Sequence, residues 1–170
     1  MLVCRIFTLL VACLSIICLL IALVTDYWLV AYGAKDISYN GLWKTCVAGR
    51  CFAPAVPDGY IVATRVLLIL ASLAALASTV CLVASFTQCT PHSMHGPLIA
   101  SITAFVAGSC TLIAVTVYTA ESWENNNASI QRTYEWSFYL AWTTFPSLLL
   151  TGIFSLVLYR RSPASGYETV

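Results

Sequence analysis

Apolar residues run through this chain in long stretches, and the charged residues fall in a few clusters between them. Residues 6–25 carry no charge and are long enough for one membrane span. Residues 66–120 are also free of charge, but this stretch is too long for one helix and is divided by the turn-forming segment QCTPHSMHGP. With a further apolar run near the end, the pattern predicts four spans, near residues 6–25, 66–86, 98–118 and 136–159.

The fourth predicted span starts with WSFYLAW, whose aromatic side chains suit a membrane–water interface, and stops at Arg160 and Arg161. We expect the first span to be retained, because no A-x-A-like cleavage site precedes TDYW. Four spans make residues 1–170 a single membrane domain. Its loops, residues 26–65 and 119–135, lie on one side, and both termini lie on the other, including the tail of residues 160–170.

Composition supports this class of protein. Hydrophobic residues make up 60% of the chain and charged residues only 9%, whereas about a quarter of a soluble domain is charged. A net charge of +1 without a basic run argues against a nucleic-acid partner and leaves membrane lipid as the surroundings. The predicted spans contain no ionisable group of the kind that marks a transport path, which makes a channel the least favoured function. No catalytic motif or metal-ligand spacing is present, so we expect no enzyme activity, no cofactor and no metal.

The orientation in the membrane has opposing indicators. The distribution of Lys and Arg favours cytosolic loops, with five such residues in the loops and three at the termini. Two features favour the opposite. Cys46 and Cys51, closely spaced around a glycine, suit a disulfide, which needs an oxidising compartment, and no second Cys or His pair in that loop supports zinc. Asn127 begins a glycosylation sequon in the second loop. We therefore expect lumenal or extracellular loops and cytosolic termini.

The first loop carries a motif, TDYW…GLWKTCVAGRC…ATR, that resembles the signature of the claudin and peripheral myelin protein superfamily. The matching positions are Trp28, Gly41, Leu42, Trp43, the two cysteines and Arg65. Claudins space the two cysteines more widely, and the C-x4-C spacing resembles the lens fibre membrane protein branch. The second half, with HGPLIASITAFVAG, VYTAESW, WSFYLAW and GYETV, resembles the natural killer cell granule protein branch.

The resemblance implies an all-α membrane fold, a left-handed four-helix bundle with a small antiparallel sheet formed by the first loop. Scattered β-formers in YWLVAY and CFAPAV, and turn residues in YNG and VPDG, suit short strands there. Small residues repeat every four positions in the second and third spans, which favours packing within one bundle over a homodimer face. Asp26 and Arg65, at the loop-side ends of two spans, either stay hydrated, pair with each other or anchor the sheet.

The final residues, GYETV, support two hypotheses. Gly166, Tyr167 and Val170 fit the G-Y-x-x-Φ signal that clathrin-adaptor subunits bind in an extended conformation. Alternatively, Thr169 and Val170 form a ligand for PDZ domains of junctional scaffolds. The resemblance favours the first, and implies a membrane protein of lysosome-related cytolytic granules that regulates granule trafficking or exocytosis through partners and also reaches the plasma membrane. The alternative is a claudin-like adhesion protein.

Cysteines near the predicted cytosolic boundary add one further candidate modification. Cys4 and Cys89 lie where reversible palmitoylation occurs in membrane proteins. The four cysteines inside the predicted spans fit the core instead, because a free cysteine packs as a small apolar residue.

Overall fold

A computed structural model of the chain describes residues 2–33, 36–87, 95–124 and 131–161. Four long helices dominate it: α1 (Leu2–Val24), α2 (Gly59–Thr87), α3 (Gly96–Glu124) and α4 (Trp136–Arg161). All four are long and apolar enough to cross a membrane. At about 1.5 Å per residue, the 29 residues of α2 span about 43 Å, well beyond a hydrocarbon core of about 30 Å. α2 is therefore longer than the hydrocarbon core.

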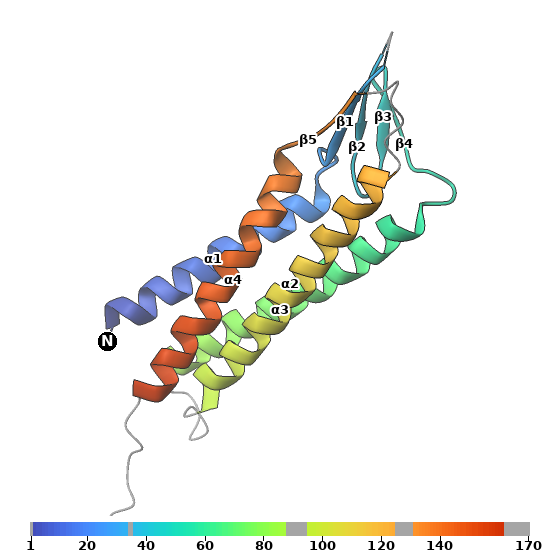
Figure 1. The fold of residues 1–170 in the computed structure, drawn as a ribbon. Coiled ribbons are helices and arrows are strands. Elements are labelled where there is room, and N and C mark those ends of the chain that lie inside the picture. Colours follow the sequence, from blue (N-terminus) through green and yellow to red (C-terminus); the bar gives the residue numbers. More distant parts are fainter. Residues whose placement is uncertain (1, 34–35, 88–94, 125–130, 162–170) are drawn as a thin grey trace, which may run out of the picture.

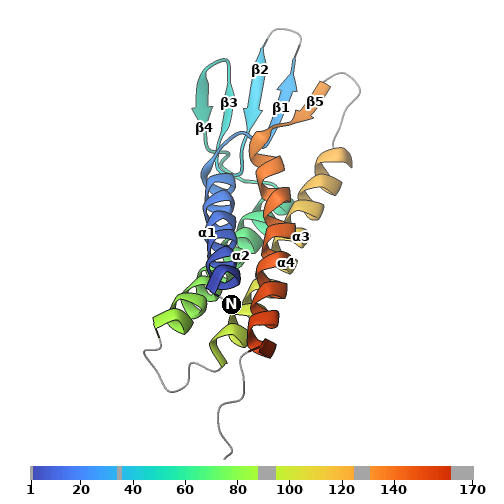
Figure 2. The same ribbon diagram turned by 90° about the vertical axis from the view of Figure 1, so that its left-hand side faces the viewer.

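The helices form a bundle with a sheet at one end. α1 packs against α2 and α4, and α3 packs against the same two helices, so the four close a ring. The sheet stands beyond one end of the bundle, and the first residues of α1 and the last of α4 lie at the other end (Figures 1 and 2). The predicted fold class, four membrane-spanning helices with a small antiparallel sheet, is confirmed.

Helix starts follow local sequence signals. The carbonyl of Asp58 accepts hydrogen bonds from the N–H groups of Ile61 and Val62, so α2 begins at Gly59, earlier than the span predicted from residue 66. Pro97 occupies the first turn of α3, where a proline costs no hydrogen bond.

Pro146 lies inside α4, and the helix continues on both sides of it. Neighbouring helices and Ser/Thr side chains make such a proline tolerable in a membrane.

The sheet has five antiparallel strands in the order β4-β3-β2-β1-β5. Four come from the first loop: β1 (Leu29–Tyr32), β2 (Ile37–Asn40), β3 (Thr45–Val47) and β4 (Arg50–Phe52). The fifth, β5 (Gln131–Tyr134), comes from the second loop and pairs with β1. The first loop therefore forms most of the sheet, as predicted, and the second loop adds an edge strand. Two local predictions also differ, because Tyr39 and Asn40 belong to β2 rather than to a turn, and CFAPAV is extended only to Phe52.

The hairpin of β3 and β4 carries the predicted disulfide. Cys46 and Cys51 are directly opposite in the ladder and are bonded to each other. Ala48 and Gly49 between the strands both have positive φ, at 50° and 79°. Two successive residues in this region form the turn that matches the twist of a tight hairpin, and glycine adopts it at no steric cost.

Small residues line the contacts between helices. Ala71, Ala75 and Ser78 on α2 and Ala100 and Ala104 on α3 are buried, and α2 and α3 form the most extensive contact between helices. Lipid provides little hydrophobic drive for helix association, so close approach through small residues supplies the packing. These repeats act within the bundle, as predicted.

Side-chain hydroxyls cross between the helices. The Ser78 hydroxyl donates to the carbonyl of Ala100, at 2.7 Å, and joins α2 to α3. The Ser101 hydroxyl donates to the carbonyl of Gly152, at 2.8 Å, and joins α3 to α4. The hydroxyls of Thr25 and Ser137 are 2.8 Å apart and join the loop-side ends of α1 and α4. These hydrogen bonds fix the register of neighbouring helices.

Candidate functional site at the junction of sheet and bundle

Two tryptophans cap the loop-side end of α1. The last carbonyls of a helix have no partner within it. Here the indole N–H of Trp28 donates to the carbonyl of Ala22, and that of Trp43 donates to the carbonyl of Leu23, both at 2.7 Å. The two tryptophans of the family motif therefore terminate the first span and attach the first loop to it.

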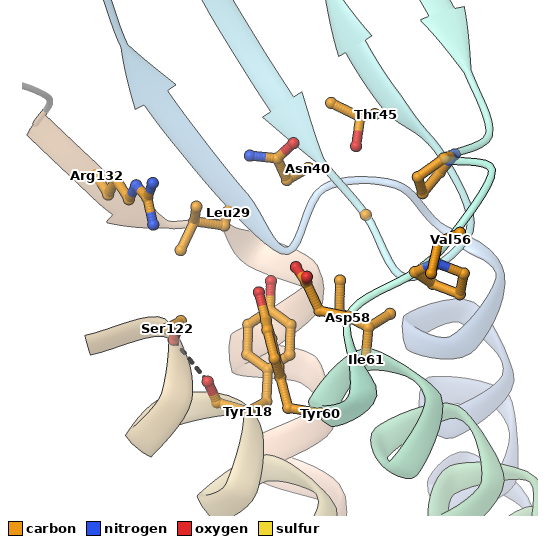
Figure 3. Close-up of a pocket in the computed structure, with 13 residues that line it drawn as sticks. Leu29, Asn40, Thr45, Val56, Asp58, Tyr60, Ile61, Tyr118, Ser122 and Arg132 are labelled. Carbon is orange, nitrogen blue, oxygen red and sulfur yellow. Dashed lines mark hydrogen bonds between the residues drawn. The ribbon is translucent and has the colours of Figure 1, made fainter. Parts of the chain in front are cut away.

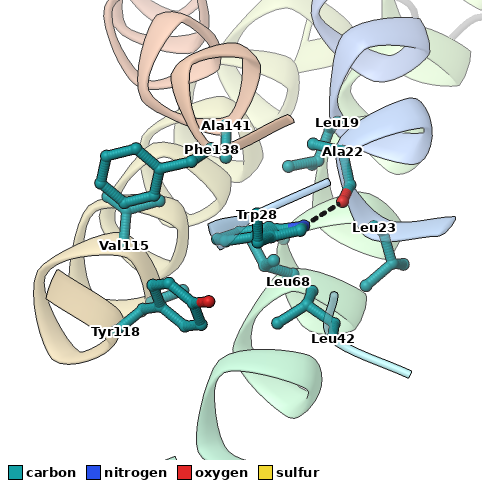
Figure 4. Close-up of a cluster of buried hydrophobic side chains, with 12 residues drawn as sticks. Leu19, Ala22, Leu23, Trp28, Leu42, Leu68, Val115, Tyr118, Phe138 and Ala141 are labelled. Atoms are coloured by element: carbon teal, nitrogen blue, oxygen red, sulfur yellow. Dashed lines mark hydrogen bonds between the residues drawn. The ribbon is translucent and has the colours of Figure 1, made fainter. Parts of the chain in front are cut away.

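Trp28 also lies at the centre of the largest buried cluster. Its side chain is fully buried, and ring centroids place it 4.9 Å from Tyr118 of α3 and 6.1 Å from Phe138 of α4 (Figure 4). Leu42, the middle residue of G-L-W, is buried in the same cluster. Because the cluster draws side chains from all four helices, the motif fastens the sheet to the whole bundle.

Arg65 of α2 holds the G-L-W segment from the other side. Its guanidinium donates through Nε and Nη2 to the carbonyl of Leu42, with the Nε contact at 2.7 Å. It also lies over the Trp43 ring, 4.7 Å from the centroid, in a cation–π contact. Of the alternatives left open by the sequence, anchoring of the sheet is the one the structure shows, and Arg65 makes its contacts with Leu42 and Trp43.

Asp26 packs directly against Gly41. A Cβ on Gly41 would lie 2.6 Å from Asp26 Oδ1 and 2.7 Å from Asp26 Cβ. Oδ1 is buried and has no hydrogen-bond partner in the part of the chain that the structure describes. The glycine of the motif is thus required by a close approach between the end of α1 and the turn after β2.

A polar cavity of about 400 Å³ lies between the sheet and the loop-side ends of α2 and α3 (Figure 3). Its lining includes Asp58 and Tyr60 at the start of α2, Tyr118 and Ser122 of α3, and Arg132 of β5. No pattern in the sequence indicates this cavity. From the sequence, Arg132 is only one of five positive charges in the loops. The pairing of β5 with β1, which places Arg132 at the cavity, has no clear sequence signal.

The cavity has the chemistry of a binding site. It offers one guanidinium, one carboxylate and several hydroxyls. Within residues 2–33, 36–87, 95–124 and 131–161, no group of three His, Cys, Asp or Glu residues could hold a metal ion.

Several predicted sites lie outside the described residues. These are the sequon at Asn127, the candidate palmitoylation site Cys89, and the tail residues Gly166, Tyr167, Thr169 and Val170. Cys4 lies in the first turns of α1 as a free, half-buried cysteine, at the end of the bundle away from the sheet. Its modification stays a prediction.

Comparison with known proteins identifies the family. Residues 1–155 match the PMP-22/EMP/MP20/Claudin family, which is more than half of the chain. The chain belongs to the PMP-22/EMP/MP20/Claudin family. The motif at the junction of sheet and bundle lies within the matched residues, and the chain is a four-span membrane protein.

Within this family, several relatives match almost the whole chain. The chain is 38% identical to Protein NKG7 of Homo sapiens over 169 residues, covering 98% of both proteins. It is 35% identical to Protein NKG7 of Mus musculus over 168 residues, again with 98% of both covered. The Lens fiber membrane intrinsic protein of Rattus norvegicus is 29% identical over 147 residues, covering 85% of this chain and 84% of that protein.

Proposed function

We propose that this protein is a non-enzymatic membrane protein of cytolytic granules or related secretory lysosomes, and that it regulates granule trafficking or exocytosis through protein partners. The observation that carries the proposal is the similarity to Protein NKG7, which spans 98% of the chain. This similarity agrees with the resemblance of the second half to the natural killer cell granule protein branch, and the tail GYETV carries a tyrosine sorting sequence.

The orientation we propose places both loops in the lumen or outside the cell. The Cys46–Cys51 disulfide supports it, because disulfides persist in oxidising compartments and are rare in the cytosol. α1 begins and α4 ends at the end of the bundle away from the sheet, so in this orientation both helix ends face the cytosol. Residues 162–170 then meet cytosolic adaptors.

In this proposal, the tail acts as a sorting signal. An extended peptide along an adaptor places the Tyr167 ring and the Val170 side chain in two separate pockets. Gly166 precedes the tyrosine, and Tyr167 is only a few residues beyond Arg161, the last residue of α4. A signal so close to the membrane suits a sorting step at the bilayer surface.

The alternative is a claudin-like adhesion protein held by a PDZ scaffold. The sequence ETV favours it, because such domains bind a free terminal carboxylate and an apolar last side chain through strand addition. This function needs Thr169 and an unmodified carboxylate on Val170. It does not need Tyr167.

The two functions separate in one localisation experiment. The protein is tagged at the N-terminus and expressed in cells with secretory lysosomes, as wild type, Tyr167→Ala and Thr169→Ala. We expect wild type and Thr169→Ala in granules and Tyr167→Ala at the cell surface. If the wild type lies at cell contacts and Thr169→Ala alone disperses it, the adhesion function replaces the granule function. A conductance unaffected by either change would instead indicate a channel.

A further inference from the structure

The polar cavity at the base of the sheet holds two opposite charges that do not pair. Arg132 and Asp58 both line it, yet no ion pair joins them within the described residues. The Arg132 Nε atom is buried and has no hydrogen-bond partner there. A buried donor without an acceptor is destabilising unless a bound molecule or water supplies one. The described protein therefore supplies no hydrogen-bond acceptor for Arg132 Nε.

The sheet register directs Arg132 into this cavity. In β5, Arg132 and Tyr134 point to the same face, because side chains alternate along a strand. Tyr134 pairs with Leu29 in the ladder, and Leu29 pairs with Asn40, so these side chains share the face that lines the cavity. The Tyr134 hydroxyl lies 3.0 Å from that of Ser122, which holds β5 against α3. Arg132 is thus positioned by the fold.

The second charge comes with aromatic rings. Asp58 immediately precedes α2, and Tyr60 lies in the first turn of that helix. Tyr60, Asp58 and Arg132 all line the cavity. Figure 3 shows the hydroxyl ends of Tyr60 and Tyr118 next to the Asp58 carboxylate, with the Arg132 guanidinium extending from the opposite wall. A carboxylate beside hydroxyl groups suits an ammonium group, and a guanidinium suits a phosphate.

The height of the cavity in the membrane narrows the choice of ligand. Its floor is formed by the loop-side ends of α2 and α3, two helices that are long and apolar enough to cross a membrane. Since α2 is longer than the hydrocarbon core, we place this end at the level of the polar headgroups of a bilayer. A volume of about 400 Å³ is large enough for a headgroup of a few heavy atoms.

We propose that this cavity binds a zwitterionic phosphoester, with the phosphate on Arg132 and the ammonium between the Asp58 carboxylate and the Tyr60 hydroxyl. The ligand carries a phosphoethanolamine or phosphocholine group. This group belongs either to a phospholipid or to a free phosphodiester. The site is independent of the tail and of the compartment in which the protein resides.

Titration calorimetry of the full-length protein in maltoside detergent tests the site, with glycerophosphoethanolamine as the probe. We expect one saturable site in the wild type and at least tenfold weaker binding in Arg132→Gln and in Asp58→Asn. Arg50→Gln is the matched control, because Arg50 is an exposed arginine of β4 outside the cavity lining. It should keep the wild-type affinity within about twofold.

Partial probes separate loss of the site from loss of the fold. Glycerol phosphate should lose binding in Arg132→Gln but not in Asp58→Asn, and ethanolamine should show the reverse. A misfolded variant would bind neither probe and would lack the Cys46–Cys51 disulfide. Absence of saturable binding in the wild type, or equal affinity in the wild type and both cavity variants, overturns the proposal and leaves water as the partner of Arg132.

Native mass spectrometry distinguishes the two sources of the ligand. The protein is extracted from vesicles that contain phosphatidylethanolamine and phosphatidylglycerol with matched chains. Retention of phosphatidylethanolamine by the wild type, lost in Arg132→Gln and Asp58→Asn, identifies a lipid headgroup. Retention that does not differ among the three proteins, combined with binding of the soluble probe, identifies a free phosphodiester.

Discussion

Asp26 occupies the space that a side chain on Gly41 would need. A Cβ at residue 41 would lie 2.6 Å from Asp26 Oδ1 and closer still to Asp26 Cα. Real Cβ atoms do not approach other heavy atoms so closely. The contact sets the distance between the end of α1 and the turn that carries Leu42 and Trp43, and both of these residues reach back to the bundle.

Gly41→Ala should therefore destabilise the protein without any change of charge. Overpacking in a close-packed region costs about 1–3 kcal/mol, because backbone must shift. Gly59→Ala is the control, since nothing lies within 4 Å of a Cβ there. Unfolding of both variants by SDS in mixed micelles measures the difference. Equal stability of the two variants would show that the loop relaxes around the added methyl group.

Trp28→Phe should lower the free energy of unfolding by more than the smaller side chain alone explains. The substitution keeps an aromatic ring but leaves the Ala22 carbonyl, which accepts from Trp28 at 2.7 Å, without its donor. An unsatisfied buried acceptor costs about 1–3 kcal/mol. Trp123→Phe is the control, because Trp123 is 71% exposed. The same SDS titration compares them, and a Trp28→Phe stability equal to that of Trp123→Phe would contradict the capping role.

The cation–π contact between Arg65 and Trp43 predicts a coupling that a double-mutant cycle can measure. Arg65→Gln and Trp43→Leu each remove one partner of a contact with 4.7 Å between the guanidinium carbon and the ring centroid. We expect a coupling free energy of about 0.5–2 kcal/mol. Arg65→Gln with Leu10→Ala is the control pair, since Leu10 is an exposed residue of α1. Additive effects in both pairs would exclude the contact as a stabilising element.

Much of the helix bundle could be predicted from the sequence, because a membrane span depends on a local run of apolar residues. A stretch of apolar residues without charge is sufficient to predict a membrane span, and all of the predicted span 6–25 except its last residue lies in α1. The disulfide was also accessible, because Cys46 and Cys51 lie close together around Gly49 in a loop without another cysteine. The resemblance supplied the fold class, which the pattern of spans alone leaves open.

The features that escaped the sequence depend on contacts between distant segments. The strand Gln131–Tyr134 is short and polar, and it is fixed by pairing with β1, a hundred residues earlier by sequence number. The placement of Arg132 in the cavity follows from that register. The role of Gly41 likewise depends on Asp26, fifteen positions away, and not on any property of G-L-W itself.

The disulfide should stabilise the protein modestly. It closes a loop of only a few residues, with a sequence separation of 5, and loop-closure entropy then contributes about 2 kcal/mol. We expect Cys46→Ser with Cys51→Ser to lower the free energy of unfolding by this amount and to abolish the response to reductant. Alkylation before and after reduction, read by mass spectrometry, checks the bond in protein from cells. Full alkylation without reduction would place the first loop in a reducing compartment.

Ser101→Ala should weaken the contact between α3 and α4, because the buried Ser101 hydroxyl donates to the carbonyl of Gly152 at 2.8 Å. Hydrogen bonds between membrane helices contribute about 0.6 kcal/mol on average and up to about 1.7 kcal/mol. Ser109→Ala is the matched control, since Ser109 is exposed on α3 and donates to Phe105 in its own helix. SDS unfolding should show a loss for Ser101→Ala and little change for Ser109→Ala. If Ser109→Ala cost as much, the effect would come from the helix itself and not from the contact between helices.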